Sequence, residues 1–328
     1  MSVKNIILLF LLASTACKKD SDSPDSENPE VSDYRQSMRD FVQGISAYGK
    51  QLKPGFIIIP QNGLDLVSNN GESTGSPNTA YLDAIDANGQ EDLLYGYDED
   101  NVATPAAETA RLRGLLNMSQ RAGNSILVID YCWDSQKMSR SYQEHAAAGY
   151  LSFAADERSL NNIPSFPAKI QGENASNITN MAQAKNFLYL INPEKYNSKA
   201  AFIAAVRASN YDLLIMDLFL SDEAFTKDEI QQLQVKANGG KRLVICYMSI
   251  GEAEDYRYYW QSSWNSNKPA WLDQENPDWK GNFKVKYWNS TWQSIIYGQE
   301  NSYTKRIIDA GFDGVYLDII DAFEYYER

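Results

Sequence analysis

The sequence predicts an α/β protein built as a single (β/α)8 barrel, and two observations lead to this fold class. From residue 34 onward, short apolar runs alternate with segments at helical spacing, which is typical of parallel strands joined by crossover helices. Most of these runs end in polar, acidic or aromatic residues, as expected where the carboxyl ends of barrel strands meet on one face. A doubly wound open sheet is the alternative, but no Gly-x-Gly-x-x-Gly turn follows any predicted strand.

Eight apolar runs are the predicted strands: 56–59, 93–97, 126–132, 187–191, 213–218, 243–250, 283–287 and 314–320. The predicted helices, where apolar residues recur every three or four positions, cover 34–52, 104–121, 198–208, 226–237 and 290–309. A ninth strand is possible at 149–153, which would make 134–185 a long excursion beside the active face. Eight strands suit a barrel, which typically needs about 250 residues plus insertions.

The first 33 residues are predicted to precede the folded domain. Lys4, an apolar run over 6–13 and small residues up to Cys17 form the pattern of a secretory signal with a lipobox cysteine. The run is too short to cross a membrane. Residues 18–33 are Ser, Asp, Pro and Glu with almost no apolar content, so they cannot bury enough surface to fold. We expect a signal peptide over 1–17, lipidation of Cys17, a disordered acidic tether over 18–33, and one domain over 34–328. The protein would then be extracytoplasmic and lipid-anchored to a bacterial outer membrane.

Composition excludes several kinds of chemistry. The 328-residue chain has 43 acidic and 30 basic residues and a formal net charge of −13, which disfavours nucleic-acid binding. The single histidine, His145, cannot build a multi-histidine metal site and is expected at the surface. Cys132 and Cys246 lie in apolar runs and are expected as buried thiols. No nucleophile elbow, phosphate-binding loop or zinc motif occurs, and no cofactor is expected.

Carboxylates and aromatic rings remain, and these are the ingredients of carbohydrate chemistry. Glycoside cleavage needs one carboxylic acid to protonate the leaving oxygen and a second carboxylate as nucleophile or base. Asp318 ends a run apolar enough to be central in the sheet, so it must be paired, hydrogen-bonded or functional, and we expect it to be catalytic. Glu252 follows a glycine and is expected to be catalytic or to bind substrate. Asp65, three residues after Asn62, lies over the barrel mouth or caps the next helix.

Other strand-end residues are expected to contact substrate, because carboxylates and amides bind sugar hydroxyls and aromatic rings stack on sugar faces. The alternatives are salt bridges for the acids, a helix cap for Asp321 and core packing for the aromatic residues. The set is Gln61, Asn62, Asp98, Asp130, Trp133, Asp217, Tyr247, Arg257, Trp288, Tyr316 and Asp321.

Several segments resemble glycoside hydrolase family 114. They are 244–257, 271–273 and 311–321, with further likeness over 56–63 and 92–100. The family includes endo-α-1,4-polygalactosaminidases and a large uncharacterised branch. The resemblance implies a (β/α)8 barrel, and it places Asp318 at the first acid of the family's Asp-x-x-Asp strand end. It implies the second acid at Asp65, with Glu252 as the alternative partner.

The order of these segments differs from the family's order. In the family, the segment like 56–63 follows the one like 311–321, whereas here it precedes it. This implies a circular permutation, which a closed barrel tolerates because its first and last strands are neighbours and domain termini often lie close together. The permutation predicts that Glu327 and Arg328 lie near the start of the helix over 34–52.

These features together predict a monomeric glycoside hydrolase that cleaves an amino-sugar-containing polysaccharide or related glycan with two carboxylates. A negatively charged barrel mouth would attract a partly deacetylated, cationic glycan. One alternative is a glycan-binding lipoprotein that kept the barrel but lost turnover. Another is a metal-assisted hydrolase with Asp130, Asp217 and Asp318 around Mg²⁺ or Ca²⁺. The membrane would be contacted through the lipid alone.

Overall fold

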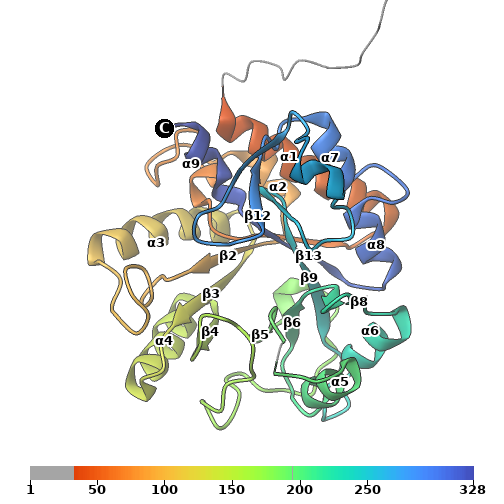
Figure 1. Ribbon diagram of the computed structural model, residues 1–328. Coiled ribbons are helices and arrows are strands. Elements are labelled where there is room, and N and C mark those ends of the chain that lie inside the picture. Colours follow the sequence, from red (N-terminus) through yellow and green to blue (C-terminus); the bar gives the residue numbers. More distant parts are fainter. Residues whose placement is uncertain (1–32, 194) are drawn as a thin grey trace, which may run out of the picture.

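The computed structural model describes residues 33–193 and 195–328. The predicted signal peptide, the predicted lipidation site Cys17 and the predicted tether up to residue 32 therefore lie outside the described residues. The described chain is a mixed α/β domain in which parallel strands occupy the centre and helices surround them (Figure 1). No helix in the described ranges has both the length and the apolar character needed to cross a bilayer.

Parallel strands form two sheets. The first has five strands in the order β1 (Ile57–Pro60), β13 (Gly314–Asp318), β9 (Leu243–Ser249), β6 (Leu213–Met216) and β5 (Phe187–Tyr189). The second has three strands in the order β2 (Ala87–Glu91), β3 (Ser125–Tyr131) and β4 (Leu151–Ala155). These strands are buried on both faces, which explains why most of them read as continuous apolar runs.

The edges of the two sheets approach each other at two places. Beside β1 and β2, the amide of Asn62 donates to the carbonyl of Gly89, and the amide of Asp86 donates to that of Ile58, each at 2.9 Å. Gly89 is needed at this point because a Cβ atom there would lie 2.1 Å from the hydroxyl oxygen of Tyr316. Beside β4 and β5, the rings of Phe153 and Phe187 lie 5.8 Å apart.

Helices connect the strands and cover their outer faces (Figure 1). Their bounds are α1 Tyr34–Leu52, α2 Thr79–Ala84, α3 Ala106–Arg121, α4 Ser135–Ala148, α5 Lys199–Arg207, α6 Lys227–Leu233, α7 Ser290–Ile296, α8 Tyr303–Asp309 and α9 Phe323–Tyr326. Single 3-10 turns add η1 Leu64–Val67, η2 Met181–Gln183, η3 Ser262–Asn265 and η4 Ile320–Ala322. Helix α1 shows why these segments are helical: Asp33 caps its first turn by accepting from the amide of Gln36, and its buried face presents Met38, Phe41 and Ile45.

One predicted strand is wrong, and another is a strand that does not belong to the parallel sheets. Residues 93–97 form a loop, because the second strand is the preceding segment β2, whose polar sequence ANGQE lacks the apolar signature. Residues 282–285 do form a strand, but it is antiparallel and lies outside both parallel sheets. The possible strand at 149–153 is real and becomes β4, and the helix predicted over 290–309 is divided into α7 and α8.

A small antiparallel sheet stands at the carboxyl ends of the parallel strands. Its order is β10 (Glu252–Glu254), β12 (Asn282–Val285) and β11 (Leu272–Glu275). We call residues 252–285 the flap. A two-stranded hairpin of β7 (Phe219–Leu220) and β8 (Glu223–Ala224) follows β6 at the same end.

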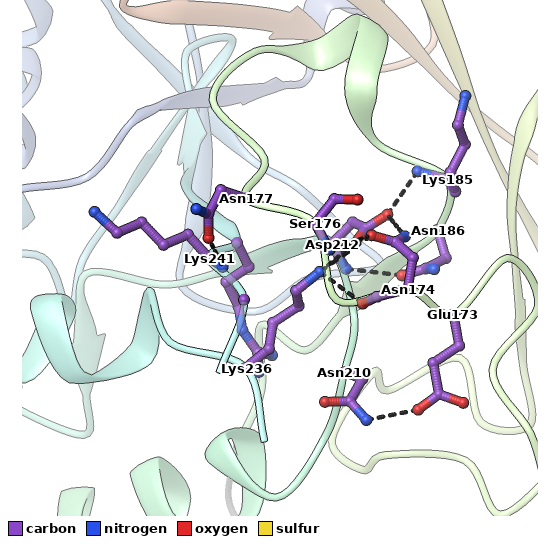
Figure 2. A network of polar contacts seen from close by, with 12 residues as sticks. Glu173, Asn174, Ser176, Asn177, Lys185, Asn186, Asn210, Asp212, Lys236 and Lys241 are labelled. Carbon is purple, nitrogen blue, oxygen red and sulfur yellow. Dashed lines mark hydrogen bonds and ion pairs between the residues drawn. The ribbon is translucent and has the colours of Figure 1, made fainter. Parts of the chain in front are cut away.

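A polar network closes the opposite end of the sheet (Figure 2). Asp212, directly before β6, accepts from Lys236 Nζ at 2.9 Å, from Asn174 Nδ2 at 2.8 Å and from the amide of Lys185 at 2.9 Å. The side chains of Asp212 and Lys236 are both fully buried. Asn174 and Lys185 belong to the long segment before β5, and Lys236 follows α6, so the network joins both segments to the amino end of β6. It lies at a distance from the strand ends that face the flap.

The two ends of the described chain meet. Arg35 Nε lies 3.0 Å from Glu327 Oε1, and the stacked rings of Tyr34 and Tyr326 have centroids 5.6 Å apart. The predicted proximity of the chain end to the start of α1 is confirmed.

Candidate functional site

A cleft of about 310 Å³ opens between the carboxyl ends of the parallel strands and the flap. Strand ends contribute Gln61, Asn62, Glu91, Tyr131, Asp217, Tyr247, Asp318 and Asp321, and the flap contributes Glu252, Glu254, Tyr256, Arg257, Trp279 and Asn282. A larger hollow of about 650 Å³ lies between α5 and α6, but it contains no gathering of strand-end acids.

Left-handed residues turn the chain at three of these strand ends. Asn62 has φ of +59°, Asp92 has +59° and Ile319 has +57°. This conformation is uncommon for residues other than glycine, and for a β-branched residue such as Ile319 it is an outlier that surrounding contacts must hold in place. Each turn occurs at or directly after a cleft residue, so the backbone leaves the strand sharply while Asn62, Glu91 and Asp318 remain at the cleft.

Asp318, the last residue of β13, is the central acid of the cleft. Its Oδ2 accepts a hydrogen bond of 2.6 Å from the hydroxyl of Tyr247 on β9. Burial raises the pKa of Asp318 to about 7, and the negative charge of Glu91 adds to this rise, while the bond from Tyr247 opposes it. Near neutral pH the carboxyl group therefore exists partly in its protonated form, which is the form a general acid needs.

Glu91, the last residue of β2, is a cleft acid that the sequence reasoning missed. Its Oε2 accepts from Asn62 Nδ2 at 3.0 Å, and its Oε1 accepts from the hydroxyl of Tyr131. Two donors therefore hold this carboxylate in place at the cleft. Asn62 also accepts, through Oδ1, from the amide of Glu91 at 3.0 Å, so β1 and β2 fix this side chain from both directions.

Two further carboxyl groups near this pair have raised pKa values. Burial raises the pKa of Asp321 to about 6, with a smaller contribution from Glu324. Burial and the charge of Glu91 raise the pKa of Asp92 to about 7, although the guanidinium of Arg158, 3.0 Å away, opposes the shift. Acids forced together away from water resist full ionisation, and such clustering is typical of acid–base sites.

Asp217 and Arg257 form an ion pair at the edge of the cleft. The guanidinium of Arg257 lies 2.7 Å from Asp217 and 2.5 Å from Glu254, so the flap is bonded to the end of β6. Glu252 lies beside this pair and is 1% exposed, with Oε1 bonded to Asn276 Nδ2 at 2.8 Å. Gln61 accepts from the hydroxyl of Tyr189 at 2.9 Å.

Six of the residues predicted to act at the site do not line the cleft. Asp65 lies in η1 and forms an ion pair of 2.9 Å with Arg111 on α3, so the geometry brings no support to its predicted catalytic role. Asp98 lies exposed in the loop after β2, and Trp133 is 59% exposed beyond β3. Both belong to loops that extend past the cleft.

The other three serve the interior of the protein. Asp130 is fully buried and accepts from Ser141, from His145 and from the amides of Leu94 and Tyr95. Trp288 packs against Tyr326 at 4.7 Å, and Tyr316 is fully buried in the core. These positions follow the structural alternatives given for them above.

His145, expected at the surface, is fully buried, and this prediction is wrong. Its Nε2 lies 2.8 Å from Asp130 Oδ2. His145, on α4, therefore helps to position Asp130, which accepts from backbone amides of the loop after β2. The buried thiols are confirmed: Cys132 and Cys246 are both free and buried. Burial raises the pKa of Cys132 to about 12, which leaves its thiol protonated and unreactive.

The predicted metal alternative does not fit the geometry. Within residues 33–193 and 195–328, no group of three or more His, Cys, Asp or Glu side chains is placed to hold a metal ion. Asp130 already accepts hydrogen bonds from four donors, and Asp217 is paired with Arg257. Neither carboxylate is therefore free to join Asp318 as a metal ligand.

Comparison with known proteins agrees with the cleft of carboxylates. Residues 168–328 match the model of glycoside hydrolase family GH114. These residues belong to glycoside hydrolase family 114. The matched part of the chain carries Asp217, Glu252, Asp318 and Asp321, whereas Asn62 and Glu91 lie ahead of it in the sequence.

Three relatives of this chain are uncharacterized proteins. One from Methanocaldococcus jannaschii is 41% identical over 156 residues, which is 47% of this chain and 42% of its own length. One from Thermotoga maritima is 37% identical over 133 residues, 40% of each chain. One from Deinococcus radiodurans is 43% identical over 124 residues, 38% of each chain. The chain thus spans about two fifths of the length of each relative.

Proposed function

We propose that this protein is a glycoside hydrolase whose two working carboxylates are Asp318 and Glu91. The observation that carries the proposal is the contrast between them. Asp318 has a pKa raised to about 7 by burial and by Glu91, whereas Glu91 is held in place by hydrogen bonds from Asn62 and Tyr131. Glycoside hydrolysis requires two carboxyl groups, one of which can donate a proton.

The chemical step follows from this division. Protonated Asp318 donates its proton to the glycosidic oxygen as the bond from that oxygen to the anomeric carbon breaks, and the leaving sugar departs as an alcohol. Glu91 supplies the negative charge that stabilises the oxocarbenium-like transition state, either by attacking the anomeric carbon or by deprotonating the attacking water. If Glu91 attacks, water then cleaves the glycosyl–Glu91 bond and gives a proton to Asp318, which restores both groups. If Glu91 instead deprotonates the attacking water, it releases that proton to solvent and Asp318 takes one up. Either route consumes one water per bond.

The proposed fold is a closed (β/α)8 barrel. Contacts of β1 with β2 and of β4 with β5 support closure, because they place the free edges of the two sheets next to each other. Closure would place Asp318 and Glu91 on β13 and β2 with β1 between them, which separates their strands by roughly 10 Å. A circular permutation of the family order is also proposed, supported by the contact of Arg35 with Glu327.

The substrate that we propose is an amino-sugar-containing polysaccharide or related glycan. The support is the excess of acids at the cleft, where among the lining residues Arg257 is paired with Asp217 and Glu254, and Arg158 with Asp92 and Asp100. A cationic, partly deacetylated glycan suits such a negative surface. Lipid anchoring through Cys17 and an extracytoplasmic position are proposed from the sequence alone.

Release of reducing ends from a panel of amino-sugar glycans tests the function. We expect turnover by the wild type and a loss of at least about 10³-fold for both Asp318→Asn and Glu91→Gln, since each removes a group that acts in the transition state. Asp65→Asn is the control, because Asp65 lies outside the cleft, and it should retain most of the activity. Full activity of Glu91→Gln together with inactive Asp65→Asn would restore the pairing implied by the family resemblance. Glycan binding without turnover by the wild type would favour the non-catalytic alternative.

A further inference from the structure

Glu252 has one carboxylate oxygen that the protein leaves unused. The side chain is 1% exposed and lies at the start of β10, where it lines the cleft. Its Oε1 accepts from Asn276 Nδ2 at 2.8 Å and lies 3.4 Å from Lys284 Nζ. Its Oε2 is buried and has no hydrogen-bond partner among the described residues.

An unpartnered buried acceptor is costly, because the group loses its hydrogen bonds to water without gaining others. The structure nevertheless fixes this carboxylate with two flap residues, Asn276 and Lys284, both of which act on the other oxygen. The arrangement fixes the carboxylate through Oε1 and leaves Oε2 without a partner, on a residue that lines the cleft. A donor that enters the cleft would satisfy it.

Two exposed aromatic residues stand on the same flap and line the same cleft. Trp279 is 61% exposed and Tyr256 is 58% exposed. The amide of Trp279 donates to the carbonyl of Asn276, the residue whose side chain holds Glu252, so the ring and the carboxylate are parts of one unit. Tyr256 is fixed by its hydroxyl, which donates to Glu254 at 2.7 Å.

A pyranose ring matches this combination, because it has apolar faces that stack on an aromatic ring and hydroxyl groups that donate at its edge. We propose that the flap forms a sugar-binding subsite beside Asp318 and Asp321, in which Trp279 stacks against a glycosyl unit and Glu252 Oε2 accepts a hydrogen bond from it. The subsite rests on the proposed glycosidase function and extends it. The cleft would bind a neighbouring sugar unit of the glycan in addition to the two units joined by the bond that is cleaved. Glu252 is thereby a binding residue.

Binding measured without turnover tests the subsite. The inactive Asp318→Asn protein is titrated with an α-1,4-linked galactosamine tetrasaccharide and, separately, with its fully N-acetylated form, by calorimetry and by tryptophan fluorescence. Glu252→Gln and Trp279→Ala are introduced into that background. In Glu252→Gln, the donors Asn276 and Lys284 hold the amide oxygen, so the NH2 group replaces the acceptor at the cleft.

We expect at least one tetrasaccharide to bind, and both substitutions to weaken that binding by at least tenfold. The fluorescence change should disappear in Trp279→Ala. Trp133→Ala is the matched control, because Trp133 is similarly exposed at 59% but lies outside the cleft, and it should change affinity by less than twofold. Trp279 is exposed, so its removal should leave the fold intact, which a thermal melt verifies.

The outcomes separate the two proposals. Unchanged affinity in Glu252→Gln and Trp279→Ala, or an equal effect of Trp133→Ala, overturns the subsite even if the wild type hydrolyses the glycan. The subsite is also overturned if neither of the two tetrasaccharides binds. Binding that depends on both flap residues supports the subsite even where the wild type releases no product, and in that case the hydrolase proposal alone fails.

Discussion

The hydroxyl of Tyr247 donates a 2.6 Å hydrogen bond to Oδ2 of Asp318, the acid whose pKa is raised by burial and by the charge of Glu91. Strands β9 and β13 are adjacent and in parallel register, with Tyr247 opposite Tyr316 and Met248 opposite Leu317, so the bond joins the ends of neighbouring strands. It favours the ionised carboxylate, whereas burial and Glu91 favour the protonated one. The pKa of Asp318, about 7, is the balance of these effects.

Tyr247→Phe should therefore raise the pKa of Asp318. If Asp318 is the general acid, activity falls as it ionises, so the alkaline limb of the kcat/KM profile should move to higher pH by roughly 0.5–1 unit. Tyr189→Phe is the control, because that hydroxyl donates its hydrogen bond to Gln61 and not to Asp318. An alkaline limb that stays in place or moves to lower pH in Tyr247→Phe would contradict the assigned role of Asp318.

Asp318→Asn should stabilise the protein at alkaline pH while it abolishes turnover. In the fold the pKa of Asp318 is about 7, against about 3.9 in an unfolded chain. Because the folded value is raised, its contribution to stability is fully present below pH 4 and is lost as pH rises through 7. The asparagine does not titrate and escapes this loss.

Urea denaturation followed by circular dichroism measures this difference. We expect the variant to match the wild type near pH 4 and to exceed its free energy of unfolding by about 1–3 kcal/mol at pH 8. Asp98→Asn, an exposed acid outside the cleft, should show no such pH-dependent gain. A variant that is less stable than the wild type at pH 8 would show that the carboxylate is stabilised, not strained, in the fold.

Lys236→Met should destabilise the protein without affecting the chemistry. The substitution leaves Asp212 buried without its cation, and breaking a buried pair in this way costs about 3–5 kcal/mol. Asp212 lies at the end of β6 opposite the cleft, so kcat of the folded fraction should not change. Lys241→Met is the control, since Lys241 is exposed and contributes to the network of Figure 2 through its backbone amide.

A second substitution separates pairing from packing. Asp212→Asn added to Lys236→Met removes the unpaired charge and should recover part of the lost stability, which a double-mutant cycle quantifies. Equal and additive losses in the two single variants would mean that the charges do not interact.

Restoring the family order of segments tests the circular permutation. The rearranged protein begins at Ala168, in an exposed stretch between β4 and β5, and joins residue 328 to residue 34 through a short Gly-Ser linker. Because the rings of Tyr34 and Tyr326 stack at 5.6 Å, a few linker residues suffice, and we expect a cooperative fold with a loss below about 3 kcal/mol.

The control opens the chain inside β9, after Ile245, where the cut would break the central sheet. It should not fold. If the opening at Ala168 also prevents folding, the present order of segments is required and the permutation proposal loses its support.

The sequence predicted most of the helices and strands because their apolar periodicity or apolar run lies within the element itself. The helix predicted over 34–52 coincides with α1, and the strand predicted over 314–320 contains β13, which ends at Asp318. Strand β2 could not be found in this way, since Asn88 and Gln90 are buried with side-chain partners on other elements. Missing that strand meant missing Glu91 at its end.

Side-chain placement depended on contacts between residues far apart in the sequence. Asp65 pairs with Arg111, 46 positions away, which no spacing rule reveals. Glu252 was expected to act on substrate, and only the structure shows that one of its oxygens is committed to Asn276 while the other is vacant. The sequence therefore identified the kind of chemistry, and the fold selected which acids can perform it.

Both ends of the described chain lie next to the flap. The hydroxyl of Tyr325 on α9 accepts from Gln274 Nε2 at 2.8 Å, and Tyr326 stacks on Tyr34 at the start of α1 (Figure 1). An affinity tag, fluorescent protein or surface immobilisation attached directly at residue 328 would lie beside the flap. Assays are best run on protein that carries no tag at residue 328.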